Sequence, residues 1–355
     1  MKILYLTTRD LGNPKTGADV RAKKVQEHLS YYNEVYSVFF SKENSNPLPQ
    51  DCFALNYPSN KFHVPFSSKY YKVVKDLISK VNFDMIYVSE IGAGTYALLA
   101  SKIYEIPIVF DDHNVEHELK KSLGNIFEYG YSYFIEKKLC DKAELVVVTS
   151  KTDESKLSNW IKNRSFILPN CYDEQIYYFE ENETLNDEYI VLFFGNMAYK
   201  PNQDAFNIIR EIIAPEVENI SSDITFHVVG PNSEKISDVY NSNVKIIGFV
   251  DSISEYIRKS DVVICPLLEG SGTRFKIIES LACGKQVIST AKGAEGWPDS
   301  WQNLLITDTQ QFSNKIINTI FESKFNMKEL DEYKVYSWGK QIESLNCELK
   351  RIAHH

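Results

Sequence analysis

Residues 261–284 have the sequence "DVVICPLLEGSGTRFKIIESLACG", and this stretch decides the fold class. It begins with a short apolar run that ends at Pro266, continues into a loop of Gly, Ser and Thr, and then predicts a helix from about Gly272. A continuously apolar strand is typical of a parallel sheet that helices cover on both faces. The stretch therefore predicts one strand–loop–helix unit of a doubly wound α/β sheet.

The same alternation of apolar runs and helical stretches continues to both ends of the chain. The predicted strands are 2–8, 34–40, 84–90, 106–113, 143–150 and 165–169 in the first half, and 189–195, 224–230, 244–249, 261–266, 286–290 and 304–307 in the second. The predicted helices are 18–30, 67–81, 92–104, 114–142, 151–162, 201–213, 251–259, 272–283 and 309–323. At 355 residues, this alternation predicts an α/β protein of two Rossmann-like domains.

An acidic and weakly patterned stretch, residues 170–187, separates the two halves and is predicted to be a linker. The domains are accordingly expected at 1–170 and 171–335. A final amphipathic helix at 336–353 is expected to pack back on the first domain. Ligands in open α/β sheets bind beyond the carboxyl ends of the strands, so we expect a cleft between two facing sheets, lined by loops from both halves.

Composition excludes several classes of protein. With 43% hydrophobic and 25% charged residues, the chain can build two cores and does not resemble a disordered protein. A net charge of −9 argues against a nucleic-acid partner. The sequence has no apolar run of about 18 residues, no signal peptide and no CxxC pair among its six cysteines, so we expect a reduced, cytoplasmic protein. The terminal His354-His355 is either native or the remnant of a tag.

The loop and helix start near Gly272 favour binding of an anion. Glycines allow the backbone to approach a ligand closely, and a helix N-terminus offers free N–H groups and a partial positive charge. Arg274 and Lys276 add full positive charges there, although the helix dipole alone would favour acids. The pattern predicts a diphosphate site, with Glu279 placed to accept hydrogen bonds from a ribose diol. A capped helix with surface charges is the alternative interpretation.

A family resemblance rests on this segment and its neighbours. "PLLEGSGTRFKIIESLACGKQVISTAKGAEG" (266–296) resembles the donor-site segment of family 4 glycosyltransferases, which are retaining sugar transferases with the two-domain GT-B fold. "FFGNMAYKPNQDA" (193–205), "HVVGPN" (227–232), "IIGFVD" (246–251) and "SDVVICP" (260–266) are also similar to that family, so the resemblance covers about 188–296. It is thinner in "KTGADVRAKKVQEHL" (15–29), "DDHNVEHE" (111–118) and "ILPNCYDEQIYYF" (167–179).

The resemblance implies transfer of a sugar, with retention of configuration, from a UDP- or GDP-linked donor. The implied acceptor is a glycan, a lipid-linked molecule or another acceptor in polysaccharide or glycoconjugate biosynthesis. The implied catalytic residues are Arg274, Lys276 and His113, with His113 near the transferred sugar. The implied donor-binding residues are Gly195 and Asn196 near the phosphates, Gly248, Phe249 and Val250 at the base, Ser271, Gly272 and Thr273 at the diphosphate, and Glu279 at the ribose. Gly17 is implied to let the N-terminal loop come near the donor.

The sequence departs from the family pattern at three places, the mildest of which is Ala18 after Gly17, where a second Gly is common. The first glutamate of a family pair falls at Ser271, and Glu269, two residues away, is the candidate to replace it. Asn196 stands where the family has Arg, and Lys200 lies one place early, so we expect Arg274 and Lys276 to supply that charge. Because the sequence contains no Asp-x-Asp, we expect no metal and no cofactor.

Three alternatives stay open. Ser271 also suits a non-catalytic GT-B partner subunit, and a GT-B nucleotide-sugar epimerase would need more acid and base residues than the sequence offers. His113 is either a site residue or a neighbour of a helix cap. Lysines beside aromatic residues favour peripheral contact with the inner face of a membrane, and a solvated helix face is the competing explanation. These lysines are Lys69, Lys72, Lys75, Lys80, Lys120, Lys121, Lys137 and Lys138.

Overall fold

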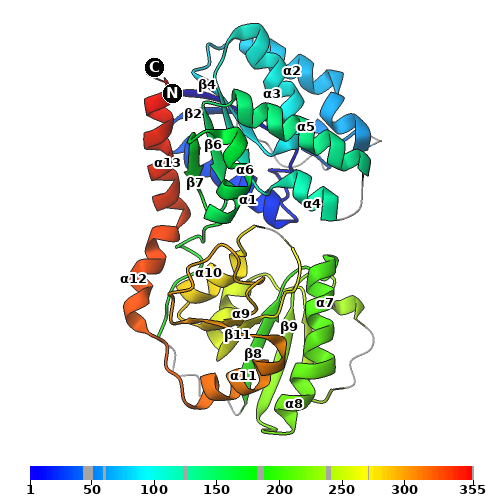
Figure 1. The fold of residues 1–355 in the computed structure, drawn as a ribbon, viewed down its shortest axis with the longest axis vertical. Helices are drawn as coiled ribbons and strands as arrows, with labels where there is room; N and C mark the ends of the chain where they lie inside the picture. The colour runs from blue at the N-terminus through cyan, green and yellow to red at the C-terminus, as the bar shows by residue number, and fades with distance from the viewer. Residues whose placement is uncertain are drawn as a thin grey trace. The chain divides into compact units, whose positions relative to one another are not determined.

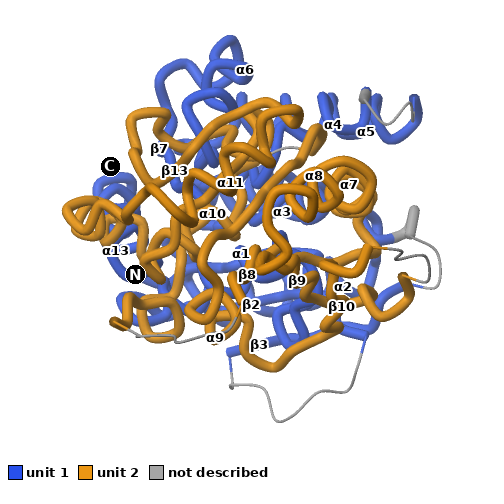
Figure 2. Tube along the Cα trace, turned by 90° about the horizontal axis from the view of Figure 1, so that it is seen from below, with its two compact units in different colours: residues 1–169, 338–355 blue, residues 170–337 orange. Residues whose placement is uncertain are grey.

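The computed structural model describes residues 1–42, 51–58, 61–122, 126–181, 188–236, 241–270 and 272–353. Ser271 and the two terminal histidines therefore lie outside the described residues. The chain forms two compact units (Figures 1 and 2). Unit 1 comprises Met1–Pro169 and Trp338–His355, and unit 2 comprises Asn170–Ser337.

Unit 1 is built on a seven-stranded sheet with the order β3-β2-β1-β4-β5-β6-β7, in which every neighbouring pair is parallel. Its strands are β1 (Lys2–Thr7), β2 (Glu34–Ser41), β3 (Cys52–Asn56), β4 (Met85–Ser89), β5 (Ile108–Asp112), β6 (Leu145–Val148) and β7 (Ser165–Ile167). Six of them confirm predicted strands, and β3 is an additional edge strand.

The helices of unit 1 lie on both faces of this sheet (Figure 1). They are α1 (Gly17–Ser30), α2 (Ser68–Ile78), α3 (Gly94–Tyr104), α4 (Glu116–Ser122), α5 (Ile126–Lys142), α6 (Lys151–Ile161) and α13 (Trp338–Ala353). The prediction of a single helix over 114–142 is wrong, because α4 and α5 are separate helices. The terminal helix α13 lies against α1. Shortly after the end of α1, Asn33 Nδ2 donates a hydrogen bond to Asn346 Oδ1 of α13 at 2.8 Å.

Unit 2 has a six-stranded parallel sheet with the order β10-β9-β8-β11-β12-β13. Its strands are β8 (Tyr189–Phe194), β9 (Ile224–Val229), β10 (Val244–Gly248), β11 (Val262–Cys265), β12 (Gln286–Ser289) and β13 (Leu304–Ile306). Its helices are α7 (Lys200–Ile208), α8 (Ala214–Glu218), α9 (Ile253–Lys259), α10 (Phe275–Ala282), α11 (Phe312–Phe321) and α12 (Leu330–Tyr333). The predicted α/β class is confirmed.

The central strands of both sheets are buried on both faces, as their apolar runs predict. Because all strands of a sheet are parallel, their carboxyl ends meet at one edge. In unit 1 this edge carries Thr8, Glu90 and His113. In the separate sheet of unit 2, the corresponding edge carries Gly195 and Pro266. In the part of the chain that the structure describes, none of the helices has the length and apolar character needed to cross a membrane.

Candidate functional site

The loop after β11 in unit 2 folds tightly around an arginine. Gly270 has a φ of +113°, a conformation that glycine adopts without strain. A Cβ atom at this position would lie 2.8 Å from a guanidinium nitrogen of Arg274, so the side chain packs directly over the glycine. Arg274 itself caps the start of α10, and one of its guanidinium nitrogens donates to the carbonyl oxygen of Gly272.

Two side chains fix the loop from outside. The backbone N–H of Asn170 donates to Thr273 Oγ1 at 2.9 Å, and its side-chain Nδ2 donates to the Thr273 carbonyl at 2.7 Å. On the other side, Trp297 Nε1 donates to the Arg274 carbonyl at 3.3 Å. Thr273 is buried by these contacts, so its predicted role at a diphosphate rests on its backbone.

Lys276 lies in the first turn of α10 and is partly buried. Its Nζ donates to Asn202 Oδ1 at 3.3 Å and lies over the rings of Phe193 and Phe194, 4.8 and 5.7 Å from their centroids. Burial lowers the pKa of this lysine. Among the described residues, no carboxylate lies within ion-pair distance of its Nζ, and Glu279 acts on its charge only at longer range.

Glu279 lies one turn further along α10 and is partly buried. Burial raises the pKa of its carboxyl to about 7, and a hydrogen bond from Tyr177 together with the charge of Lys276 offsets part of that rise. Near neutral pH both the protonated and the ionised form of this carboxyl are therefore populated. A carboxylate in this state accepts hydrogen bonds from neighbouring hydroxyls.

The loop after β8 lies beside Lys276. A Cβ at Gly195 would be 2.8 Å from Asn202 Nδ2, which donates to the Asn196 carbonyl at 2.9 Å. The Asn196 side chain accepts from Ala198 N and from Asn232 Nδ2, both at 2.9 Å. Asn196 thus shapes the loop where the family has a charged residue. Lys200 is 71% exposed and forms an ion pair with Asp204.

The remaining predicted residues of unit 2 lie further along the same sheet edge. The Gly248 carbonyl accepts from Gly230 N at 2.8 Å, so the end of β10 is tied to the end of β9. Phe249 is 66% exposed, and Val250 is partly buried. Glu269 is exposed on the loop after β11. The structure therefore gathers Gly195, Arg274 and Lys276 near one another, and it leaves Phe249 and Glu269 at the surface.

Gly17 and His113 belong to unit 1. Gly17 is the first residue of α1, whose N-cap Thr16 forms a capping box with Asp19. His113 directly follows β5 and is only 5% exposed. Its Nε2 lies 2.9 Å from Ser89 Oγ and 3.6 Å from Asp111 Oδ2. Ser89 was not among the site residues predicted from the sequence.

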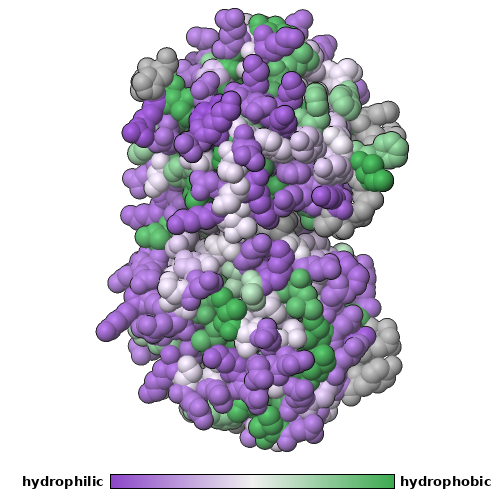
Figure 3. Space-filling model, in the orientation of Figure 1, coloured by the Kyte–Doolittle hydropathy of each residue, from purple (hydrophilic) through white to green (hydrophobic). Residues whose placement is uncertain are grey.

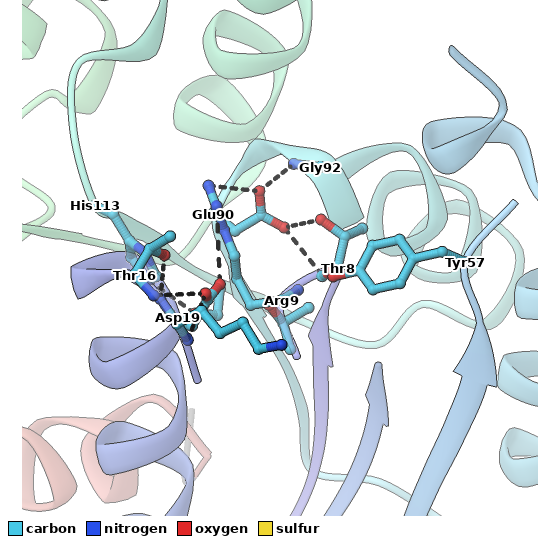
Figure 4. Close-up of polar contacts among 11 residues, drawn as sticks. Thr8, Arg9, Thr16, Asp19, Tyr57, Glu90, Gly92 and His113 are labelled. Atoms are coloured by element: carbon cyan, nitrogen blue, oxygen red, sulfur yellow. Dashed lines mark hydrogen bonds and ion pairs between the residues drawn. The ribbon is translucent and has the colours of Figure 1, made fainter. Parts of the chain in front are cut away.

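A polar cluster that includes Arg9 and Glu90 occupies the same edge of unit 1 (Figure 4). The Glu90 carboxylate accepts from Thr8 N at 3.1 Å, from Thr8 Oγ1 at 2.7 Å and from Gly92 N at 3.0 Å. Arg9 Nη2 lies 3.8 Å from Glu90 Oε2, and Arg9 Nη1 lies 4.0 Å from Asp19 Oδ1. Glu90 has φ 72° and ψ 161°, a strained backbone region that is essentially reserved for glycine, and such strain is typical of functional sites.

Arg9, Asp19, Asn170 and Asn202 were not predicted from the sequence. Arg9 and Asp19 fall within the loop after the first strand and the start of the helix that follows, and their position at a parallel-sheet edge was the available signal. In the described residues, no group of three or more His, Cys, Asp and Glu side chains is arranged to hold a metal ion.

Comparison with known proteins identifies the class. The two parallel Rossmann-like sheets match GT-B glycosyltransferase structures. A glycosyltransferase from Rickettsia africae has a TM-score of 0.71 and 15% identity over 99% of this chain and 98% of its own. Sucrose-phosphate synthase from Thermosynechococcus elongatus has a TM-score of 0.68 and 17% identity over 99% and 96%. Anabaena HepE in complex with UDP-glucose has a TM-score of 0.67 and 17% identity over 100% and 97%.

Two family models then name the family. Residues 33–176 match Glycosyltransferase Family 4, and residues 188–321 match Glycosyl transferases group 1. A search of curated proteins found no match. The chain therefore contains family 4 and group 1 glycosyltransferase domains, and the resemblance seen in its sequence is confirmed.

Proposed function

We propose that this glycosyltransferase moves a sugar from a nucleoside-diphosphate sugar, bound by unit 2, to a glycan or lipid-linked acceptor, with retention of configuration. The proposed place of the reaction is the biosynthesis of a polysaccharide or glycoconjugate. Unit 1 is the proposed acceptor side, and the strained cluster of Glu90 and Arg9 at its sheet edge supports this assignment.

The observation that carries the proposal is the cation at Lys276. Its charge has no ion-pair partner among the described residues, and Arg274 lies two residues before it at the start of α10. A diphosphate supplies the missing negative charge, and the N-terminus of a helix is a favourable place for an anion. Glu279, with its raised pKa, is the proposed partner of the ribose hydroxyls.

In the proposed reaction the diphosphate is the leaving group. Arg274, Lys276 and the N-terminus of α10 stabilise the negative charge that develops on it, an electrostatic contribution that is often the largest in catalysis. These cations take the place that a divalent metal has in other transferases, so we propose a metal-independent reaction. His113 in unit 1 is the proposed partner of the transferred sugar.

The test is calorimetric binding of UDP, GDP and ADP to the native chain. We expect one nucleotide to bind with micromolar affinity, and we expect Arg274→Ala, Lys276→Ala and Glu279→Ala each to weaken it about 10-fold or more. Lys245→Ala is the matched control, because Lys245 is an exposed lysine of unit 2 that pairs with Glu188 on the surface. The affinity of the control and of EDTA-treated protein stays unchanged.

The outcome of this test separates the hypotheses. If no nucleotide binds, the donor-site proposal is wrong, and a non-catalytic partner subunit becomes the better hypothesis. If a nucleotide binds, its sugar conjugates are screened, and the anomeric configuration of the product is determined by NMR. An inverted product would contradict the retaining reaction.

We also propose that unit 1 contacts an anionic membrane through α5. Its outward face consists of residues that are all exposed, and it is apolar in the first half and basic in the second. These residues are Ile126, Phe127, Gly130, Tyr133, Phe134, Lys137 and Lys138. Hydrophobic side chains lie at the surface near the start of α5 (Figures 1 and 3). Such a face suits a surface where lipid-linked acceptors reside.

A further inference from the structure

The His113 ring has one satisfied nitrogen and one that lacks a partner. Nε2 lies within hydrogen-bond distance of Ser89 Oγ, whereas Nδ1 is buried and has no hydrogen-bond partner among the described residues. A buried polar atom without a partner destabilises a fold, so such an atom in a native structure calls for an explanation. The other groups around the ring determine whether Nδ1 donates or accepts.

The first of these groups is an ionised carboxylate. Asp111 Oδ1 lies 2.8 Å from a guanidinium nitrogen of Arg21, and both side chains are fully buried. Tyr87 donates to Asp111 Oδ2 at 3.1 Å. Burial alone raises the pKa of Asp111, but the charge of Arg21 and the contact with His113 lower it below its usual value. Asp111 is therefore a carboxylate at neutral pH.

Arg21 is held independently of Asp111. Another of its guanidinium nitrogens donates to the carbonyls of Leu168 and Pro169, at 2.9 and 3.3 Å. The guanidinium thus links α1, the end of β5 and the last residues before unit 2 begins. This fixed cation holds the Asp111 carboxylate in one orientation, with Oδ2 toward the imidazole.

The carboxylate sets the tautomer of His113. Burial lowers the pKa of the ring, and Arg21 and Arg9 lower it further, although Asp111 acts in the opposite direction. The ring is therefore neutral and carries one proton. The Asp111 carboxylate, 3.6 Å from Nε2, favours the tautomer with the proton on Nε2, because a lone pair there would face negative charge. The proton of Ser89 is free to point to the hydroxyl of Tyr5, which donates to the Ala22 carbonyl.

We propose that Asp111, anchored by Arg21, is a positioning residue that keeps His113 Nδ1 as a hydrogen-bond acceptor for a sugar hydroxyl. A hydroxyl donates a hydrogen bond to such a lone pair, whereas a phosphate or carboxylate oxygen only accepts and is repelled. The site therefore selects an uncharged hydroxyl at this position. The inference rests on the proposed function, because it takes the ligand of His113 to be a sugar substrate.

The primary test is the tautomer itself. Long-range ¹H–¹⁵N NMR at pH 7 on the full chain is expected to show His113 with a protonated Nε2 and an unprotonated Nδ1. The signals are assigned by their loss in His113→Gln. A protonated Nδ1, or a doubly protonated ring, would overturn the proposal without any variant. This measurement needs no substrate.

The second test exchanges the carboxylate. Asp111→Asn is expected to move the proton to Nδ1 and to lower kcat/KM for sugar transfer at least 10-fold, while nucleotide affinity changes less than about 2-fold. Asp112→Asn is the matched control, because Asp112 is the next residue and interacts with Glu136. We expect it to change neither the tautomer nor kcat/KM. An unchanged tautomer in folded Asp111→Asn would contradict the positioning role. If Asp111→Asn does not fold, the wild-type spectrum still decides.

The third test identifies the hydroxyl. Native protein and His113→Phe are compared on monodeoxy analogues of the donor sugar and of the acceptor. We expect the native protein to discriminate about 10-fold against one deoxy analogue, and His113→Phe to lose that discrimination at the same position. If the affected deoxy position is on the donor sugar, the hydroxyl that His113 binds belongs to the donor. If it is on the acceptor, the hydroxyl belongs to the acceptor. Equal discrimination by both proteins on every analogue would mean that Nδ1 binds water, and the ligand assignment would be wrong. Nucleotide binding by the native chain tests the proposed function separately.

Discussion

At the scale of single residues, the two neighbouring aspartates at the end of β5 have opposite protonation states. Asp111 is ionised beside Arg21, whereas burial together with the carboxylates of Glu136, Glu116 and Asp153 raises the pKa of Asp112 well above its usual value. Asp112 therefore holds its proton at neutral pH. Because its folded-state pKa lies above its unfolded value of about 3.9, it stabilises the fold at low pH, and this stability is lost as pH rises.

The prediction concerns Asp112→Asn. An amide resembles the protonated acid, so the variant is expected to stay within about 1 kcal/mol of the native free energy of unfolding at pH 5. Between pH 5 and 9 the native protein loses stability relative to the variant, by up to about 1.4 kcal/mol per pH unit. Urea unfolding across this range measures the difference. A constant difference would mean that Asp112 is ionised throughout.

Glu136→Gln is the informative comparison for this experiment. The Glu136 carboxylate accepts from the backbone N–H groups of Glu116 and His117, at 2.7 and 3.2 Å. An amide oxygen can replace only one of its two oxygens, so the start of α4 loses a partner. We expect this variant to be less stable than Asp112→Asn at every pH. Equal stability would show that the backbone contacts of Glu136 contribute little.

At the scale of elements, the outward face of α5 defines a second prediction. Ile126 and Phe127 are 81% and 89% exposed, and Lys137 and Lys138 lie on the same face three turns later. We expect flotation with vesicles that contain anionic lipid, weaker flotation with neutral vesicles, and a loss of binding at high salt. The double substitution Ile126→Ser and Phe127→Ser is expected to reduce the partition coefficient about 10-fold.

Ile220→Ser provides the control, because Ile220 is an isolated side chain of unit 2 that is 55% exposed. It should float as the native chain does. Native protein that stays unbound with anionic vesicles would remove the membrane proposal. Equal loss in the control and the double variant would indicate nonspecific adsorption.

The properties of individual elements also explain which of them could be predicted from the sequence. Strands buried on both faces, such as β6 and β11, were predicted within two residues of their bounds because their continuous apolar runs have one structural explanation. The edge strand β3 was missed, since it is partly exposed along its length and its short apolar run, residues 52–55, contains none of the β-branched residues that favour strands. The helix predicted to end at residue 213 continues through a π-helical turn into α8, because Pro215 lies in a first turn, where proline is tolerated.

The candidate site divides in a similar way. Arg274, Lys276 and Glu279 were found because they share one local strand–loop–helix pattern. Asn202 lies 74 residues before its partner Lys276, and Asn170 lies 103 residues before its partner Thr273. Strand pairing and a loop contact bring these residues together. A single sequence contains no signal for such long-range partners. Arg9 and Glu90 were similarly separated by the crossover that places β4 beside β1.

At the scale of the whole molecule, unit 2 is inserted into unit 1 between Pro169 and Trp338, and α13 completes unit 1. The inner face of α13 is fully buried and includes Leu345, whereas Lys350 on the same helix is exposed. Truncating a buried leucine to alanine costs about 2–5 kcal/mol. We therefore expect Leu345→Ala to lower the stability of unit 1, although the substitution lies at the far end of the chain from β1.

This prediction also tests whether the two units unfold separately. In calorimetric unfolding, Leu345→Ala should lower the transition of unit 1, whereas Lys350→Ala should not. A nucleotide at 100 times its dissociation constant should stabilise unit 2 by about 2.7 kcal/mol in the native chain and in both variants. If Leu345→Ala also weakened nucleotide binding, the stability of the donor site would depend on α13. The chain would then unfold as one cooperative body, with its second half relying on the last helix of its first unit.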